Sequence, residues 1–182
     1  MRSPRDLDAA LECPSREVLL TGAHIGNLAP LARRIHDAGK LAMVHSDFIG
    51  GFRPDAVGVR LLKNQFGVDA MFSSSAAVLR EAHKCGLVSY LRIFLVDSRS
   101  LDKTVESIRG FEGDGVELLP GPVAGRVLGQ FRSQLPARQI LAGGFISTVE
   151  EVSALRALGF DGVTTSSNST WSDLDEVHPG NR

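Results

Sequence analysis

The chain has 182 residues, of which 43% are hydrophobic and 23% are charged. These values are typical of a globular domain with a packed core, and the length suits one domain. A net charge of −1 argues against a protein that coats nucleic acid, because such binding needs many cationic contacts to phosphate. Two cysteines without paired spacing, Cys13 and Cys85, argue against a disulfide framework or a cysteine zinc site and fit a reducing cytoplasm. No apolar run approaches bilayer-spanning length, and the first residues do not resemble a signal peptide.

The first residues predict the start of a helix. Ser3 suits the N-cap, Pro4 the first helical position and Asp6 the first turn. After this helix, short apolar segments alternate with segments of helical period. The short segments predict seven strands, which are Glu17–Leu20, Leu41–His45, Ala70–Phe72, Leu87–Phe94, Gly115–Leu118, Ile140–Ala142 and Gly162–Thr165.

The segments between these strands predict helices that each pack one apolar face against a sheet. Their apolar residues recur three or four positions apart. The stripes are Leu28, Leu31, Ile35 and Ala38; Leu101, Val105, Ile108 and Phe111; Leu128, Phe131 and Leu135; and Val152, Leu155 and Leu158. Strict alternation of strand and helix predicts a parallel sheet of the α/β class.

A TIM-like (β/α) barrel is the architecture that we expect from this alternation. Such a barrel has eight strands, whereas seven are visible, so we expect the first strand to be missing from this chain. An open seven-stranded or doubly wound sheet is the alternative. Residues 1–171 are expected to form the single barrel domain. Residues 172–182 are expected to be a disordered polar tail, because they show no period and contain Pro179-Gly180.

Small and polar residues follow the predicted strands, at the edge where parallel α/β folds bind ligands. Gly143 and Gly144 follow the sixth visible strand and let backbone N–H groups approach an anion. Ser166, Ser167 and Asn168 follow the seventh strand and add hydroxyl and amide donors. Loops after the last two strands of such a barrel commonly bind phosphate. We therefore predict a phosphate site there, the alternative being two tight turns that serve only the fold.

Ser147 and Glu150 are expected to form a capping box for the helix that follows the sixth visible strand. We interpret both residues as structural.

Charged side chains also occur within or directly after apolar strands. His45 and Asp47 are two residues apart at a strand end, so we expect both to point to the same side. That side is the mouth of the barrel, the opening at the carboxyl-terminal ends of the strands, where both residues would hold ligand hydroxyls. Arg92 and Glu117 lie in neighbouring apolar strands, where an unpaired charge is expensive. We expect them to face each other inside the barrel, either as an internal ion pair, or as an anion-steering arginine and a hydroxyl-accepting glutamate, or both.

An enzyme on the same scaffold is an alternative function, in which Asp47 and Glu117 act as paired carboxylates or hold a magnesium ion. It would be a phosphodiesterase, isomerase or prenyl transferase that acts on a small phosphorylated metabolite. The sequence shows no histidine-rich metal spacing, nucleophile elbow or Walker loop. We therefore predict no catalytic residue, no metal ligand and no cofactor. A phosphometabolite sensor that contacts protein rather than RNA is a further alternative.

Six segments in order resemble the glycerol-3-phosphate-responsive antiterminator family, the regulators of glycerol uptake operons. The resemblance runs from about Arg2 to Trp171. The segments are Leu19–Gly22, Val44–Ile49, Arg92–Ser98, Glu117–Gly121, Ala142–Ile146 and Thr164–Asn168, with Trp171 following.

This resemblance implies a TIM-like barrel that binds glycerol 3-phosphate as effector and acts on leader mRNA to prevent transcription termination. Family members usually open with a short strand before the segment that matches Arg2–Leu11. Ligand binding would order loops at the mouth or stabilise a homo-oligomer, and so complete an RNA-binding surface. The ligand-site candidates carried over are His45, Asp47, Arg92, Glu117, Gly121, Gly143, Gly144, Ser166, Ser167 and Asn168.

One departure from the family concerns Ser73-Ser74-Ser75, where relatives often carry a basic third residue. The substitution removes a cation from the mouth and bears on ligand identity. Basic residues elsewhere form only loose groups, such as Arg33, Arg34 and Lys40, which are typical of a solvated helix face. The sequence shows no aromatic platform of the kind that reads single-stranded RNA.

Overall fold

The computed structural model describes residues 6–97, 101, 104–105 and 108–171. Ser3, Pro4 and the predicted tail, residues 172–182, lie outside the described residues. The strands are β1 (Glu17–Leu20), β2 (Leu41–His45), β3 (Ala70–Ser73), β4 (Val88–Phe94), β5 (Gly115–Leu119), β6 (Gln139–Gly143) and β7 (Gly162–Thr164). Each lies within two residues of its predicted bounds.

Helices connect these strands. They are α1 (Asp6–Glu12), α2 (Leu28–Asp37), α3 (Ala56–Asn64), α4 (Ala76–Lys84), α6 (Gly121–Ala124), α7 (Leu128–Gln134) and α8 (Val149–Ala157), with 3₁₀ helices η1 (Ser46–Phe48) and η2 (Ile108–Gly110). The predicted helix over 101–111 falls partly outside the described residues. Its described apolar residues, Leu101, Val105, Ile108 and Phe111, pack against the core.

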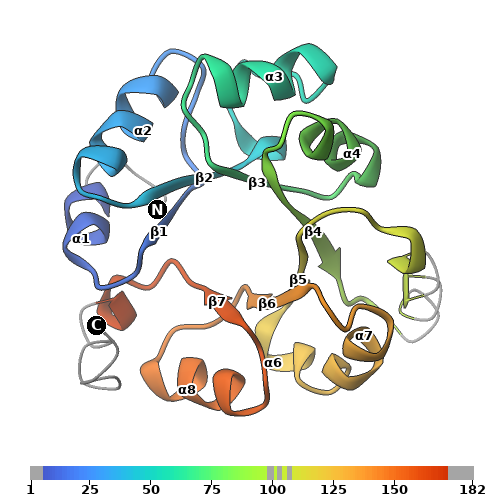
Figure 1. Ribbon diagram of the computed structural model, residues 1–182. Helices are drawn as coiled ribbons and strands as arrows, with labels where there is room; N and C mark the ends of the chain where they lie inside the picture. The colour runs from blue at the N-terminus through green and yellow to red at the C-terminus, as the bar shows by residue number, and fades with distance from the viewer. Residues whose placement is uncertain (1–5, 98–100, 102–103, 106–107, 172–182) are drawn as a thin grey trace.

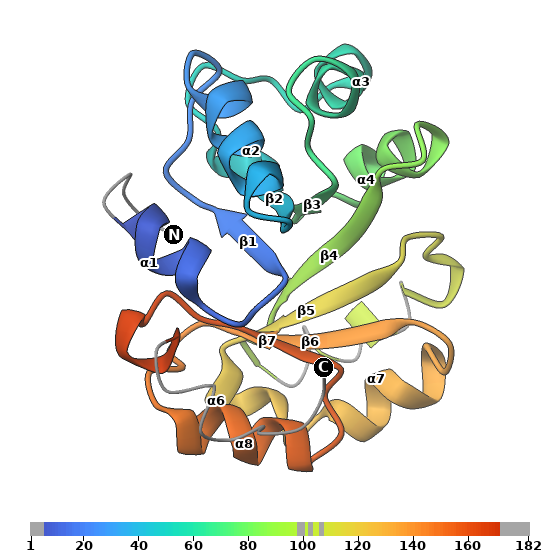
Figure 2. The ribbon, with the colours of Figure 1, turned by 60° about the vertical axis from the view of Figure 1, so that its left-hand side comes forward.

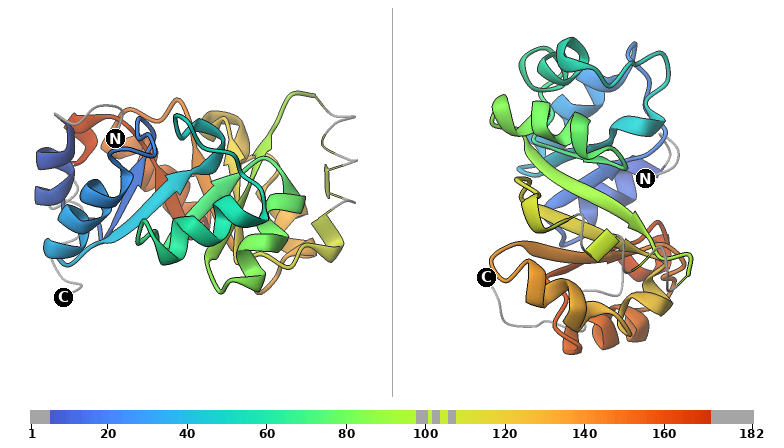
Figure 3. Two further views of the ribbon diagram at one scale, coloured as in Figure 1. Left: turned by 90° about the horizontal axis from the view of Figure 1, so that it is seen from above. Right: turned by 90° about the vertical axis from the view of Figure 1, so that its right-hand side faces the viewer.

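The strands form one parallel sheet in the order β1-β2-β3-β4-β5-β6-β7. The sheet curves into a nearly closed ring with the helices around its outside (Figure 1). The turned views show the helices on that outer face as well (Figures 2 and 3). A doubly wound sheet would carry helices on both faces and would reverse its strand order. The open-sheet alternative is therefore wrong, and the fold is a TIM-like (β/α) barrel.

The two edges of the sheet are β1 and β7. Within the described residues neither edge strand pairs with the other, and the segment before β1 is the helix α1. In Figures 1 and 2 this helix lies beside the last described turn, residues 168–171. Ala10 of α1, Cys13 and Trp171 line one common cavity, which agrees with that placement.

The interior and exterior of the barrel follow the period of two along each strand. Val44, Met71, Val116 and Ile140 face outward and are fully buried under the helices. A separate interior cluster is built from Met43, Ala70, Phe72 and Tyr90. Because both faces of the central strands are covered, β3 and β5 are buried along their whole length.

Side chains in the preceding loops cap three of the described helices, α3, α4 and α8. Asp55 caps α3 by accepting from the N–H groups of Val57 at 3.0 Å and Gly58 at 2.9 Å. The predicted capping box of Ser147 and Glu150 is wrong by one residue. Thr148 is the N-cap of α8, and its partner is Glu151, whose carboxylate accepts from the Thr148 N–H. The same carboxylate oxygen also accepts from the Ser147 N–H at 2.8 Å, so Ser147 belongs to the loop before the cap.

Three aspartates join successive strands at their amino-terminal ends. Each directly precedes an odd-numbered strand and accepts a hydrogen bond from a backbone N–H at the start of the preceding strand. The pairs are Asp69 with Ala42 at 2.7 Å, Asp114 with Ser89 at 2.9 Å and Asp161 with Ile140 at 2.7 Å. The backbone N–H of each aspartate in turn donates to the carbonyl of its partner residue. We call each pair of hydrogen bonds between an aspartate and its partner residue an aspartate clasp. The three clasps fix the relative register of β2 with β3, β4 with β5, and β6 with β7.

Replacing Asp114 by alanine tests the clasps. Ser89 is fully buried, so its N–H loses a partner that water cannot replace. We expect Asp114→Ala to lower the free energy of unfolding by about 1–3 kcal/mol in urea denaturation. Asp8→Ala is the control, because its exposed pair with Arg34 should contribute less than about 1 kcal/mol. Equal losses in the two variants would contradict a structural role for the clasp.

Candidate functional site

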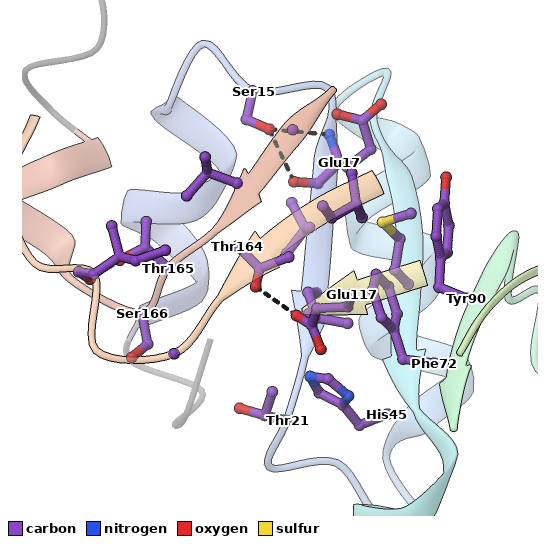
Figure 4. Close-up of a pocket in the computed structure, with 18 of the residues that line it drawn as sticks. Ser15, Glu17, Thr21, His45, Phe72, Tyr90, Glu117, Thr164, Thr165 and Ser166 are labelled. Atoms are coloured by element: carbon purple, nitrogen blue, oxygen red, sulfur yellow. Dashed lines mark hydrogen bonds between the residues drawn. The ribbon is translucent and has the colours of Figure 1, made fainter. Parts of the chain in front are cut away.

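A cavity of about 470 Å³ occupies the interior of the barrel. Residues from all seven strands line it, and it extends from Glu17 and Gln139 at the amino-terminal ends to the loops at the carboxyl ends. Figure 4 shows Thr21, His45 and Glu117 around one space, with Thr164 joined to Glu117 by a hydrogen bond. The carboxyl-terminal end of this cavity is our candidate site.

Arg92 and Glu117 form an ion pair inside the barrel, as the sequence predicts. They are register partners on β4 and β5, and Arg92 Nε donates to Glu117 Oε2 at 2.9 Å. The side chains are 9% and 1% exposed. No described residue bonds the two terminal guanidinium nitrogens of Arg92, which lines the cavity. A buried cation therefore presents N–H donors to the space where a ligand would lie.

Glu117 is held by a second donor. Thr164 Oγ1 on β7 donates to Glu117 Oε1 at 2.6 Å, so each carboxylate oxygen has one partner and a lone pair to spare. Gly143 on β6 lies between these strands. A Cβ at this glycine would stand 2.5 Å from Glu117 Oε1 and 2.4 Å from Thr164 Oγ1. The glycine thus gives the room in which Glu117 and Thr164 meet.

His45 stands in a column of rings inside the barrel. Phe72 stacks on Tyr90 with ring centroids 4.8 Å apart, and His45 lies 5.2 Å from Phe72 and 5.6 Å from Phe48. Burial, reinforced by the nearby Arg92 charge, lowers the pKa of His45 from its usual 6.5 to about 3, although the Asp47 charge acts in the opposite direction. The imidazole is therefore neutral at neutral pH. Its Nδ1 atom is buried without a hydrogen-bond partner among the described residues.

Asp47 does not share the face of His45. It lies in η1 rather than on the strand, so the period of two no longer applies to it. Its carboxylate accepts from the Ser73 hydroxyl at 2.8 Å and the Ser74 N–H at 2.8 Å. Burial alone would raise the pKa of Asp47, but the hydrogen bonds from Ser74, Ser73 and Ser46 hold it below its usual range. Asp47 is not among the residues that line the cavity, and it ties η1 to the end of β3.

The loops after β6 and β7 are joined by hydroxyl groups. Thr165 Oγ1 donates to the Ile146 carbonyl at 2.7 Å. Ser167 Oγ and Thr170 Oγ1 both donate to the Ser147 carbonyl, at 3.1 and 2.9 Å. The Ser167 hydroxyl is therefore committed to the loop. Ser166 is exposed and lines the cavity, whereas Ser167 does not line it.

The structure brings together half of the predicted ligand residues, namely His45, Arg92, Glu117, Gly144 and Ser166. The others, Asp47, Gly121, Gly143, Ser167 and Asn168, do not line the cavity. Gly121 has a packing role, since a Cβ there would lie 2.6 Å from Ile146 Cδ1. Sequence reasoning missed Thr21, Phe72, Tyr90 and Thr164. The sequence pattern that could have identified them is the period of two along each strand, because Thr21 and Thr164 continue the series of inward-facing positions of β1 and β7.

Comparison with known proteins shows the family. Residues 1–171 match the model of the family described as glycerol-3-phosphate responsive antiterminator. The chain belongs to this family. It is also 25% identical to the uncharacterized protein YgcP of Escherichia coli over 165 residues, which cover 91% of this chain and 85% of that protein.

Solved structures agree with this assignment. The glycerol uptake operon antiterminator regulatory protein of Listeria monocytogenes matches with a TM-score of 0.87 and 26% identity, over 94% of this chain and 92% of that chain. A glycerol uptake operon antiterminator-related protein of Thermotoga maritima matches with a TM-score of 0.81 and 26% identity, over 94% and 95% of the two chains. An aldolase, QR15, matches at 13% identity with a TM-score of 0.73 and shows the fold alone.

Replacing Gly143 by alanine tests the meeting of Glu117 and Thr164. The added Cβ would displace a buried carboxylate, so we expect the free energy of unfolding to fall by about 1–3 kcal/mol. Gly129→Ala in α7 is the matched control, because its Cβ meets nothing within 4 Å. It should raise stability by up to about 1 kcal/mol through helix propensity. Gly143→Ala as stable as the unaltered chain would refute the close fit.

His45 gives a pH dependence with a definite sign. Its folded pKa lies below its unfolded value, so the unfolded chain binds the proton first and stability falls between pH 6.5 and 3. In that window the loss from this group approaches about 1.4 kcal/mol per pH unit. We expect His45→Gln to flatten this acid limb in urea denaturation measured at several pH values. An unchanged slope would mean that His45 takes up its proton at the same pH in the folded and the unfolded chain, so that folding does not lower its pKa.

Proposed function

We propose that this chain binds glycerol 3-phosphate in the barrel cavity and that the bound effector controls antitermination on the leader mRNA of glycerol-utilisation genes. The supporting observation is Arg92, a buried cation whose terminal nitrogens have no described partner and which lines the cavity. An anion at these nitrogens would gain charge-assisted hydrogen bonds in a poorly solvated place. The family description supplies the effector and the regulatory role.

The groups around Arg92 suit the two ends of such a molecule. The phosphate would accept hydrogen bonds from the Arg92 N–H groups, the Ser166 hydroxyl and the backbone N–H of Gly144. The glycerol hydroxyls would donate to the spare lone pairs of Glu117 and exchange a hydrogen bond with neutral His45. Gly143 and Ser167 would act on this site indirectly. Gly143 leaves room for the Glu117 side chain, and Ser167 holds the loop through its hydrogen bond to the Ser147 carbonyl.

The enzyme alternative lacks a supporting geometry. Asp47 and Glu117 were its paired carboxylates, and only Glu117 lines the cavity. Among the described residues no group of three or more His, Cys, Asp or Glu side chains is placed to hold a metal ion. In the same part of the chain, no helix is long and apolar enough to cross a membrane. The family description supports the regulator, which is the function that we carry forward.

A double variant tests the ligand site without leaving a buried charge unpaired. Arg92→Met alone would strand the Glu117 carboxylate, at a cost of about 3–5 kcal/mol, whereas Arg92→Met with Glu117→Gln removes both charges. We expect calorimetric titration to show saturable binding of glycerol 3-phosphate by the unaltered chain. Binding should weaken at least about 10-fold in the double variant, because the charged phosphate contact is lost.

Controls separate ligand identity from site position. Glycerol and inorganic phosphate should each bind much more weakly than glycerol 3-phosphate, since each lacks one half of the contacts. Arg34→Met removes an exposed arginine that pairs with Asp8, and it should leave the affinity unchanged. Full affinity in the double variant would place the phosphate elsewhere. No binding of glycerol 3-phosphate by the unaltered chain would refute the effector.

A further inference from the structure

The strongly exposed phenylalanines of the described chain all lie at the mouth of the barrel. Phe48, Phe94 and Phe145 are 56%, 52% and 85% exposed. They end or follow β2, β4 and β6, so they come from alternate strands around the mouth. The other described phenylalanines are buried or half-buried. We call these three residues the phenylalanine rim.

Two members of the rim contact Arg92, which lines the cavity. The guanidinium carbon of Arg92 lies 5.3 Å from the ring centroid of Phe48 and 5.1 Å from that of Phe94. Both contacts are cation–π interactions, in which a flat cation stacks on an aromatic face. The side chain that presents N–H donors to the cavity therefore also contacts two rings at the mouth of the barrel.

The third member is held in a costly backbone conformation. Phe145 has φ of 57°, and among the described residues it is the one non-glycine with positive φ. A bulky residue in this region is strained by roughly 1–2 kcal/mol. The side chain is 85% exposed, so little packing offsets the strain. Strain of this kind persists where it positions a group for a partner.

We propose that the phenylalanine rim is a platform on which unpaired bases of single-stranded RNA stack, directly above the effector cavity. This inference rests on the proposed function and names the surface through which it acts. Recognition of single-stranded RNA uses aromatic faces and arginine planes for base stacking. Phe145 offers an exposed ring, and Phe48 and Phe94, each about half exposed, offer the ring surface that the Arg92 guanidinium leaves uncovered. The sequence showed no such platform, because the three residues are far apart in the chain and only the barrel brings them to one end.

The charge of the molecule favours this partner over a duplex. Duplex RNA is held mainly by contacts to phosphates and 2′-hydroxyls. The chain has a net charge of −1, and Arg92 is the sole cationic side chain that lines the cavity within the described residues. Affinity from stacking with few phosphate contacts depends weakly on salt. For single strands the logarithmic salt slope is about −0.7 per phosphate neutralised, so we expect a slope weaker than about −2.

The shared arginine gives the effector a way to act on RNA. A phosphate bound to Arg92 fixes the guanidinium, and the guanidinium fixes the rings of Phe48 and Phe94. Bases then stack on a preorganised surface, so RNA binds more tightly to the loaded chain. By thermodynamic linkage, RNA must raise the affinity for glycerol 3-phosphate by the same factor.

The test measures binding of a fluorescently labelled pool of short single-stranded RNA to the full chain, with and without saturating glycerol 3-phosphate. Phe145→Leu keeps an apolar side chain and loses the flat face, whereas Phe145→Trp keeps the face. We expect the leucine variant to lose about 10-fold in RNA affinity and the tryptophan variant to retain it. Phe48→Leu and Phe94→Leu should in addition reduce the effect of glycerol 3-phosphate on RNA affinity.

Controls keep this test independent of folding and of the effector site. Phe145→Gly removes the strained side chain, so its melting temperature should not fall although its RNA affinity does. Val57→Ala changes an exposed apolar residue on α3 and should change neither affinity. Leucine variants that bind RNA as tightly as the unaltered chain would overturn the platform. An unaltered chain that binds glycerol 3-phosphate but no RNA would refute the antiterminator function itself.

Discussion

The ion pair between Arg92 and Glu117 constrains the half of the barrel at the carboxyl-terminal ends of the strands. Two charges inside an apolar ring are tolerated only when they face each other and their remaining polar atoms find partners. Arg92 and Glu117 are exact neighbours across β4 and β5, and Thr164 supplies the second donor to Glu117 from β7. Gly143 lies on β6, where a Cβ would come within 2.5 Å of both Glu117 Oε1 and Thr164 Oγ1 and so prevent this meeting. Four successive strands are thus arranged around one carboxylate.

The sequence predicted those features that depend on period and on charge. Apolar strands and helical stripes alternate clearly enough to place all seven strands within two residues. Arg92 and Glu117 were predictable as a pair because a lone charge in an apolar strand is too costly. The hydrogen bonds of Asp69, Asp114 and Asp161 are not predictable from period or charge, although each aspartate directly precedes an odd-numbered strand. Their role depends on contacts with the preceding strand, which local pattern does not show.

The sequence could not decide which polar residues at the strand ends face a ligand. Asp47 was expected on a strand, yet the chain turns into η1 after His45 and directs that carboxylate to Ser73 and Ser74. Ser166 and Ser167 are adjacent and alike in type. Of these two serines, Ser167 donates to the Ser147 carbonyl, which commits its hydroxyl to the loop. Such choices are made by loop geometry, because a hydroxyl bonds whichever carbonyl the backbone places within reach.

Position 75, where the resemblance to the family implies a basic residue, has a structural role of its own. Ser75 is the N-cap of α4 and accepts from the Val78 N–H at 3.5 Å, so the position serves the helix, and it is not among the residues that line the cavity. Arg92 is left as the sole cationic side chain lining the cavity in the described chain. An anionic ligand would therefore depend on the same guanidinium that holds Phe48 and Phe94. A second cation would neutralise part of the ligand's negative charge without any contact to these rings. On the proposed mechanism, with Arg92 alone, binding of the phosphate and positioning of the rim would be one event, and the mouth would act as a switch.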